Sequence, residues 1–490
     1  MKRYAVWLTA LLMAVAVVWL VLPKPAQVAP SARLLEVAEG LDDISLSVRL
    51  NEKDRSLSVI QTLHLQNRTG QEQDAAVLRT WANAFQTLDT SPCAAEEALY
   101  SQYYPNGFSS GAVVMAQAQA NGQQVLHRYT DDARTVLKVP VPGGWQAGET
   151  VELKLVYTIH LPQMANRFGV WQDIWAIGNA FAIPAVWENG AFRTDPYASV
   201  GDPFVSDCAN YTVTVTVPKG YVCAGSAHPL VKADGENLVY TFDAPAVRDF
   251  ALTVSPNYQK AQKLTNGVLV TAYARTKAQA RQLLRDGQKA LALYSELFGS
   301  YLYPSYTLAQ VHFPMGGMEY PGMSMLSSAL CEEGGRELEY AVAHETAHQW
   351  WYAVVGSDSW NQAWQDEALC EYSLLLYAQE RYGMAERNDL EQSRMESALR
   401  VTVPPGVSPG APLDYFASMS EYKLLVYDRG AACLCAIDRT VSLDRFLRDY
   451  YGAYAFSRAA RADFEQQLFA STGEDMIPLM RDYLDTSIVN

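Results

Sequence analysis

The chain has 490 residues, of which 49% are hydrophobic and 19% are charged, and its formal net charge is −15. This length exceeds what one hydrophobic core usually organises, so two or three domains are expected. The ordinary composition excludes wholesale disorder and a polytopic membrane protein. The acidic balance excludes nucleic acid as a partner, because no Lys/Arg-rich block offsets it. Nothing in the sequence requires an obligate protein partner.

The N-terminus differs from this globular composition. Lys2 and Arg3 precede an uncharged apolar run over residues 5–22, which Pro23 ends. Eighteen helical residues span about 27 Å, close to the hydrocarbon thickness of a bilayer. We expect residues 1–24 to be an uncleaved membrane anchor, with a cleaved export signal as the alternative. The first case predicts a single-pass protein of the cell membrane with its folded part, from residue 30 onward, outside the cytoplasm, and the second predicts secretion.

Residues 25–42 are rich in Pro and Ala and are expected to be a linker. Alternating apolar and polar residues then predict β-strands at 44–50, 58–65, 151–161, 211–217 and 237–254. Residues 43–258 are therefore predicted to form a β-rich domain. Seven cysteines form no C-x-x-C pair, and we expect no essential disulfide.

Helical periodicity begins near residue 277 and continues to about 298. A mixed segment of short strands is expected up to about 330. Further helices are predicted at about 336–355, 361–382 and 422–438. The second half of the chain should therefore be mostly α-helical.

One of these helices carries the pattern of a metal site. His344 and His348 are four residues apart, so on a helix their imidazoles lie about 40° apart around the axis and reach one metal ion. Glu345 lies about 100° from His344, where it faces a metal-bound water and not the metal. We therefore predict one zinc ion per chain, with Glu345 as the catalytic base.

The next helix supplies a third ligand. Glu367 follows His348 by nineteen residues, and a catalytic zinc needs three protein ligands and an open position. Glu371 lies one turn further along the same face. From there it is expected to accept a hydrogen bond from a ligating histidine and to fix its tautomer, with a solvated carboxylate as the alternative.

These residues resemble the aminopeptidase N family of zinc metallopeptidases, which are gluzincins with a thermolysin-like catalytic domain. The family pattern is H-E-x-x-H, eighteen residues, then E, and it matches His344, Glu345, His348 and Glu367. The resemblance implies an α+β fold. Its N-terminal domain, at 43–258, is all-β and antiparallel, saddle-like or sandwich-like. A mostly α, thermolysin-like zinc peptidase domain follows at 259–490. The chain is similar to the short, two-domain bacterial members of the family.

The resemblance also assigns a substrate site. The Gly-x-Met-Glu-Asn segment of the family reads Gly316, Gly317, Met318, Glu319 here, followed by Tyr320 in place of asparagine. It implies that Glu319 binds the free α-amine of a peptide, which fits the charge of an ammonium group. The change to tyrosine leaves the details of the pocket open.

A tyrosine of the family helps to hold the developing oxyanion. Tyr427, followed by Asp428, Arg429 and Gly430, matches its context, and Tyr422 is the nearest alternative. The resemblance thus implies an aminopeptidase that removes N-terminal residues from peptides with a free N-terminus. The alternatives are a catalytically inactive binding protein on the same fold and another zinc hydrolase, such as an endopeptidase or an epoxide hydrolase.

Overall fold

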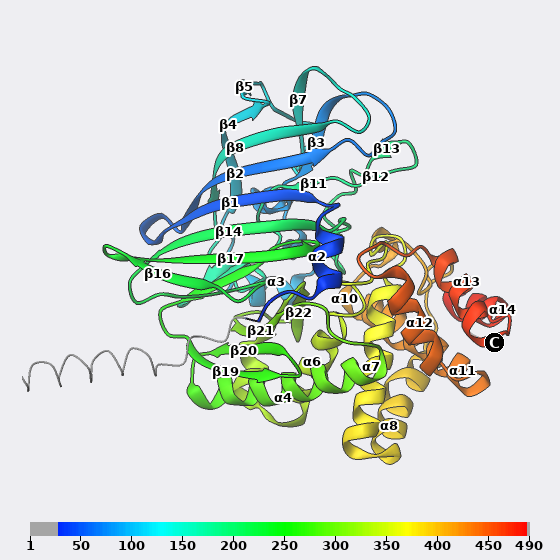
Figure 1. The fold of residues 1–490 in the computed structure, drawn as a ribbon. Coiled ribbons are helices and arrows are strands. Elements are labelled where there is room, and N and C mark those ends of the chain that lie inside the picture. The colour runs from blue at the N-terminus through cyan, green and yellow to red at the C-terminus, as the bar shows by residue number, and fades with distance from the viewer. Residues whose placement is uncertain (1–27, 488–490) are drawn as a thin grey trace, which may run out of the picture.

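The computed structural model describes residues 28–487, which form a β-rich half and a mostly helical half (Figure 1). The apolar run at residues 5–22, predicted to be a membrane anchor, lies outside the described residues. Within residues 28–487, none of the helices has both the length and the apolar character needed to cross a membrane. All seven cysteines fall in the described range, as free thiols.

An eight-stranded sheet dominates the N-terminal half. In spatial order its strands are β16 (Leu230–Asp234), β17 (Asn237–Val247), β14 (Ala209–Pro218), β1 (Asp42–Asn51), β2 (Ser56–Gln66), β8 (Thr150–His160), β4 (Ala112–Ala120) and β5 (Gln123–Gln124). β1 and β2 contain the strands predicted at 44–50 and 58–65, and they pair in antiparallel register. The expectation of a fully antiparallel domain was wrong, because β1 pairs with β14 in parallel. A parallel pair needs a long connection, and most of the domain lies between these two strands.

Smaller sheets complete the β-rich half. One contains β15 (Val222–Gly225), β18 (Leu252–Ser255), β10 (Ile174–Ile177) and β9 (Phe168–Trp171). Another contains β11 (Ile183–Pro184), β3 (Gln73–Arg79), β7 (Val136–Trp145) and β6 (Arg128–Tyr129), and β12 (Trp187–Glu188) pairs with β13 (Ala191–Phe192). The strand predicted over 237–254 is therefore two strands, β17 and β18, which belong to different sheets.

The predicted linker is partly helical. Residues Ala32–Ala38 form α2, which Ser31 caps by accepting a hydrogen bond from the backbone N–H of Leu34. Leu34 is fully buried. Figure 1 shows α2 lying against the large sheet beside β17. Residues 32–38 of the predicted linker therefore pack on the β-rich half as a helix, and the expectation of a linker was wrong for this part.

The second half begins with a five-stranded sheet in the order β19 (Gln259–Thr265), β20 (Val268–Ala274), β21 (Ser305–Val311), β23 (Met323–Ser327) and β22 (Gly317–Tyr320). Between β20 and β21 runs α4 (Lys277–Leu297), which begins with a capping box formed by Thr276 and Gln279. β22 is the outer strand and pairs with β23 in antiparallel register. The segment that should bind the peptide amine thus lies on a sheet edge, next to the helices.

Helices form the rest of this half. They are α5 (Ser328–Glu333), α6 (Gly335–Ala347), α7 (Trp364–Tyr382), α8 (Met384–Leu390), α9 (Ser397–Leu399), α10 (Met419–Tyr422), α11 (Gly430–Thr440), α12 (Asp444–Tyr454), α13 (Arg461–Thr472) and α14 (Ile477–Leu484). A π-helical turn, Lys423–Arg429, joins α10 to α11. A short helix of the β-rich half, α3 (Glu97–Tyr103), lies near the boundary between the halves.

The helix predicted over 336–355 ends eight residues early. α6 stops at Ala347, and His348 is its C-cap. The chain then turns back, with the N–H of Ala353 bonded to the carbonyl of His348. Trp350 and Trp351 are both buried in this turn. A continuing helix would point these neighbours about 100° apart, and the turn lets both enter the core.

The two halves pack together closely. One cluster of buried apolar side chains runs through both of them, from Leu34 to Leu484. Arg248, at the end of β17, is 2% exposed. Its guanidinium donates to the carbonyls of Ser206 in the β-rich half and Tyr352 in the helical half, at 2.9 and 2.8 Å. A buried arginine with backbone acceptors on both sides fixes the relative position of the halves.

Candidate zinc centre

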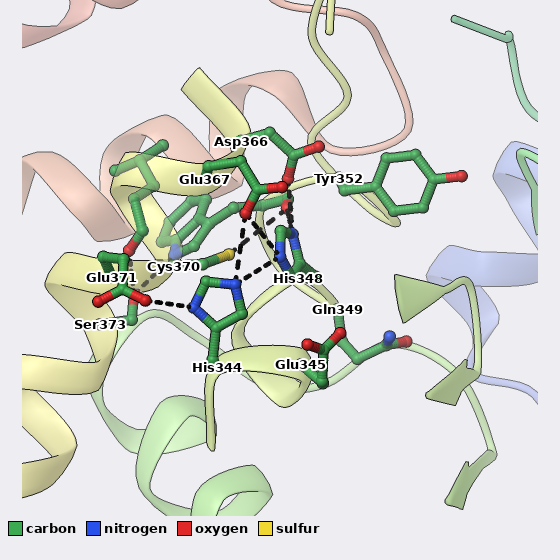
Figure 2. A network of polar contacts seen from close by, with 12 residues as sticks. His344, Glu345, His348, Gln349, Tyr352, Asp366, Glu367, Cys370, Glu371 and Ser373 are labelled. Carbon is green, nitrogen blue, oxygen red and sulfur yellow. Dashed lines mark hydrogen bonds and ion pairs between the residues drawn. The ribbon is translucent and has the colours of Figure 1, made fainter. Parts of the chain in front are cut away.

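Three side chains from α6 and α7 converge on one point, as Figure 2 shows. Nε2 of His344 lies 3.1 Å from Nε2 of His348. Oε2 of Glu367 lies 3.3 Å from the first nitrogen and 3.4 Å from the second. The residues that sequence spacing predicted as metal ligands are therefore brought together in space, and all three are buried.

The size of this triangle fits zinc. Bonds of about 2.0–2.1 Å at the tetrahedral angle put neighbouring ligand atoms about 3.3–3.4 Å apart. The three observed separations cluster around that value. Within residues 28–487, the two histidine nitrogens are the only recorded contacts of the buried Oε2 of Glu367. A cation at the centre of the triangle would bind this oxygen together with both nitrogens and stabilise the buried carboxylate.

Each histidine contacts a second carboxylate through its other ring nitrogen. Oε1 of Glu371 lies 3.1 Å from Nδ1 of His344, as the sequence predicted. Oδ1 of Asp366 lies 2.6 Å from Nδ1 of His348. These contacts leave both Nε2 atoms free to face the metal. Sequence reasoning missed Asp366, although its position directly before Glu367 at the start of a helix was a usable signal.

Glu345 lies on α6 between the two histidines, and one of its carboxylate oxygens lies within 4.8 Å of a ring nitrogen of His348 (Figure 2). It is 5% exposed, and among the described residues its Oε2 has no hydrogen-bond partner. The carboxylate packs against Gly317, where an added Cβ would lie 2.4 Å from Oε1 of Glu345. The sheet edge thus carries a glycine where the predicted base needs space.

A pocket of about 760 Å³, including its open mouth, begins at the histidines and Glu345. Met315, Met318 and Glu319 line it. Glu319 is 4% exposed, and within residues 28–487 its Oε1 has no hydrogen-bond partner. Gly317 lines the pocket as well, whereas Gly316 is exposed beside it.

Residues 284–483 match the model of the peptidase family M1 domain. This part of the chain, within the helical half, is therefore a peptidase family M1 domain. The matched range contains both predicted histidine ligands, Glu345 and Glu367.

Known proteins agree with this M1 assignment. Aminopeptidase B from Rattus norvegicus is 23% identical over 284 residues, which are 52% of this chain and 41% of the relative. Aminopeptidase N from Homo sapiens is 24% identical over 51% of this chain and 29% of the relative. The chain therefore spans less than half the length of these curated relatives.

Solved structures share the fold over most of the chain. The M1 zinc metallopeptidase from Deinococcus radiodurans has a TM-score of 0.62 and 20% identity, covering 92% of this chain and 94% of that one. A variant of that enzyme bound to a Tyr-Ser-Ala substrate also has a TM-score of 0.62, with 19% identity, covering 90% and 93%.

The two candidate tyrosines occupy different positions. Tyr427 stacks parallel to the ring of His344, with ring centroids 5.7 Å apart, and donates a 2.6 Å hydrogen bond to Oε1 of Glu367. It lines the pocket beside the metal triangle. Tyr422 is 1% exposed and lies behind Tyr427, with its ring edge-on to it. The geometry favours Tyr427 as the residue that reaches a substrate.

Tyr320, which replaces the family's asparagine, points away from the metal triangle. Its hydroxyl donates a 2.8 Å hydrogen bond to Oδ1 of Asn179 in the β-rich half. A Cβ on Gly178 would lie 1.9 Å from that hydroxyl. The larger side chain is therefore accommodated by a glycine across the boundary between the halves.

Burial and charge set the protonation of the metal ligands before a cation binds. Burial alone would lower the pKa of His344, but contacts with Glu367 and Glu371 raise it to about 9. Burial alone would raise the pKa of Glu367, but both histidines hold it well below the usual value. Glu367 thus stays ionised, while His344 must lose a proton when a metal binds.

Proposed function

We propose that the protein is a zinc aminopeptidase, which removes N-terminal amino acids from peptides with a free N-terminus. One observation carries the proposal. A single pocket joins the zinc-sized triangle, a buried carboxylate beside it in Glu345, and a second buried carboxylate, Glu319, on the sheet edge. Glu319 supplies a counter-charge for the substrate's ammonium group. An endopeptidase would have no use for such a charge next to the scissile bond.

A zinc ion held by His344, His348 and Glu367 would supply a Lewis acid that lowers the pKa of water and polarises a carbonyl. Glu345 takes a proton from the attacking water and returns it to the nitrogen of the leaving peptide. Burial raises the pKa of Glu345 to about 7, which suits a group that both accepts and donates a proton near neutral pH.

Two other residues position the substrate. Tyr427 donates a hydrogen bond to the carbonyl oxygen as negative charge develops on it. Glu319 holds the ammonium group, so that only the first peptide bond reaches the metal triangle. Gly317 and Met318 lie on β22 and line the pocket along which the first substrate residue lies, whereas Gly316 precedes this strand. Beyond the triangle, a second hollow lined by Tyr340, Leu374 and other side chains receives the residues that follow the scissile bond.

The experiment compares a free peptide with its N-acetylated form, using full-length protein in detergent, with and without 1,10-phenanthroline. We expect cleavage of the free peptide only, release of one residue at a time, and loss of activity together with zinc. Equal cleavage of the free and the N-acetylated peptide would refute the aminopeptidase proposal and favour another zinc hydrolase. Full activity without a bound metal would refute the zinc site.

We also propose that residues 5–22 anchor the protein in the cell membrane, with the catalytic part outside the cytoplasm. The uncharged apolar run, preceded by Lys2 and Arg3, supports this proposal. Alkaline carbonate extraction of membranes, followed by mass spectrometry of the N-terminus, tests it. Extraction as a soluble species that begins near residue 25 would show signal cleavage and secretion.

A further inference from the structure

The strand β22, which carries Met318 and Glu319 along the pocket, has only four residues and lies at the edge of its sheet. Its backbone pairs with β23 on one side. An edge strand leaves one row of its N–H and C=O groups outside the ladder, so other contacts must fix its position. Tyr320, the last residue of β22, is fully buried and makes such contacts.

Each half of the molecule holds Tyr320 by one contact. Its carbonyl accepts a 3.0 Å hydrogen bond from Nε2 of Gln349, and Oε1 of Gln349 accepts from the N–H of Gly322 at 2.8 Å. Because Gln349 directly follows the predicted ligand His348, this contact ties the end of β22 to the metal helix. The Tyr320 side chain reaches the β-rich half, where its hydroxyl donates to Oδ1 of Asn179.

The contact with the β-rich half continues to a buried acid. Nδ2 of Asn179 donates a 3.0 Å hydrogen bond to Oδ2 of Asp249, and Oδ1 of Asp249 accepts from the N–H of Phe250 at 2.7 Å. Asn179 and Asp249 are both buried, and burial raises the pKa of Asp249 to about 7. The ionised carboxylate only accepts hydrogen bonds, so it turns the amide nitrogen of Asn179 toward itself and the amide oxygen toward the Tyr320 hydroxyl.

The end of β22 also fits closely against the β-rich half. Gly322 has a φ of +72°, and an added Cβ would lie 2.1 Å from the carbonyl oxygen of Ser226. Asn179 has a φ of +50°, a conformation that asparagine adopts more readily than most residues. Gly178 beside it leaves the space that the Tyr320 hydroxyl occupies. Both sides of this contact are therefore shaped to bring the phenol to the amide.

We propose that Asn179 and Asp249 are positioning residues, which act through the Tyr320 hydroxyl to hold the end of β22, and with it Glu319, in place beside the metal triangle. Within the part of the chain that the structure describes, neither Asn179 nor Asp249 lines the pocket, so their effect must pass through Tyr320. A buried acid destabilises a fold unless it has a task, and orienting this amide gives Asp249 one. The inference rests on the proposed aminopeptidase function and adds a way in which the β-rich half controls the pocket.

The test compares Tyr320→Phe with Tyr303→Phe in the full chain, at a pH above the pKa of Asp249. Tyr303 is the matched control, because it is also buried and its hydroxyl donates across the same boundary, to the carbonyl of Ala246 at 3.0 Å. Each change removes one buried hydroxyl, so both variants should lose a similar amount of stability. Tm, zinc content and the kinetics of leucine 4-nitroanilide hydrolysis are measured for both.

For Tyr320→Phe we expect KM to rise about fivefold, which corresponds to the loss of one hydrogen bond. The change in kcat should stay below about twofold, because Glu319 holds the ammonium group equally in the ground state and the transition state. For Tyr303→Phe both constants should change less than about twofold. An unchanged KM in Tyr320→Phe, an equal rise of KM in both variants, or a fall in kcat alone would overturn the inference.

Double variants test whether the three residues act as one chain. Asn179→Gly removes the amide and tolerates the φ of +50°, and Asp249→Asn removes the charge that orients the amide. Each should raise KM in the parent protein, but by less than about twofold when added to Tyr320→Phe, since the hydroxyl through which they act is then absent. Full multiplication of the single effects would show that Asn179 and Asp249 act independently of Tyr320 and would refute the proposal.

Hydrogen exchange of residues 317–320, followed by mass spectrometry, gives a measurement that needs no turnover. The amides of β22 should exchange faster in Tyr320→Phe than in Tyr303→Phe, because only the first change releases the strand. If the unaltered protein does not hydrolyse leucine 4-nitroanilide, the aminopeptidase proposal fails, and the exchange rates alone decide whether the chain of hydrogen bonds holds β22. If the unaltered protein is active and neither KM nor exchange differs between the two variants, only the role of Asn179 and Asp249 is refuted.

Discussion

Gly317→Ala should impair catalysis without touching a metal ligand. The added Cβ would lie 2.4 Å from Oε1 of Glu345, whereas an ordinary contact needs about 3.4 Å. The carboxylate or the strand must therefore move by about 1 Å. A displacement of that size at a catalytic group costs about 10²-fold in kcat, or about 2.7 kcal/mol of transition-state stabilisation.

The neighbouring glycine provides a matched control. At Gly316 an added Cβ would meet only Leu330, at 3.9 Å, which is an ordinary contact. Steady-state hydrolysis of leucine 4-nitroanilide should therefore show a large fall in kcat for Gly317→Ala and less than about a twofold change for Gly316→Ala. Zinc content and Tm are measured for both variants. A Gly317→Ala enzyme with kcat within threefold of the parent would refute the reasoning.

Four further outcomes are expected. Glu345→Gln should lower kcat by about 10²–10⁴-fold while zinc stays bound, since this residue moves the proton; unchanged turnover in a zinc-loaded variant would remove Glu345 from the mechanism. Asp366→Asn should weaken zinc binding by about 10- to 100-fold in a chelator competition, because Asp366 orients His348, and an unaltered affinity would contradict that role. Tyr427→Phe should lower kcat by about 10²-fold or more, whereas Tyr422→Phe should have little effect on kcat. A large fall in kcat for Tyr422→Phe and none for Tyr427→Phe would assign the oxyanion contact to Tyr422. Zinc binding to the metal-free protein should release a proton below about pH 9, because the raised pKa of His344 keeps the ring protonated there. The apparent affinity for zinc should fall as the pH is lowered. Calorimetry of zinc binding in buffers of different ionisation enthalpy would detect the released proton. If no proton is released, the His344 ring is not protonated in the metal-free protein.

The metal ligands were predictable because helix geometry relates their spacing directly to their direction. His344 and His348 are one turn apart, so the sequence alone indicated that both reach one ion. The alternation at 211–217 was similarly informative, since it predicted a strand, and the apolar residues Tyr211, Val213 and Val215 on one face of β14 are buried. Patterns of this kind depend only on local geometry.

Other features depended on contacts that no local pattern records. The end of α6 is set by the burial of Trp350 and Trp351 in the core, and neither breaks a helix by itself. The parallel pairing of β1 with β14 joins strands far apart in the chain. Asp202 approaches the pocket only because Gly201 packs against the opposite half. Such features follow from tertiary packing, which overrides local preference.

Arg248 packs against carbonyls of both halves and so holds them in one arrangement, which bears on how the pocket can change during evolution or in engineering. The halves form one rigid frame, yet they contribute different parts of the pocket: the helices carry the metal ligands, while Tyr197 and Asp202 come from a loop of the β-rich half. Under the proposed aminopeptidase function, substitutions in that loop can therefore change which peptide ends are accepted without altering the metal ligands. Libraries that aim to alter selectivity should be randomised there, outside the segment that the M1 family model matches.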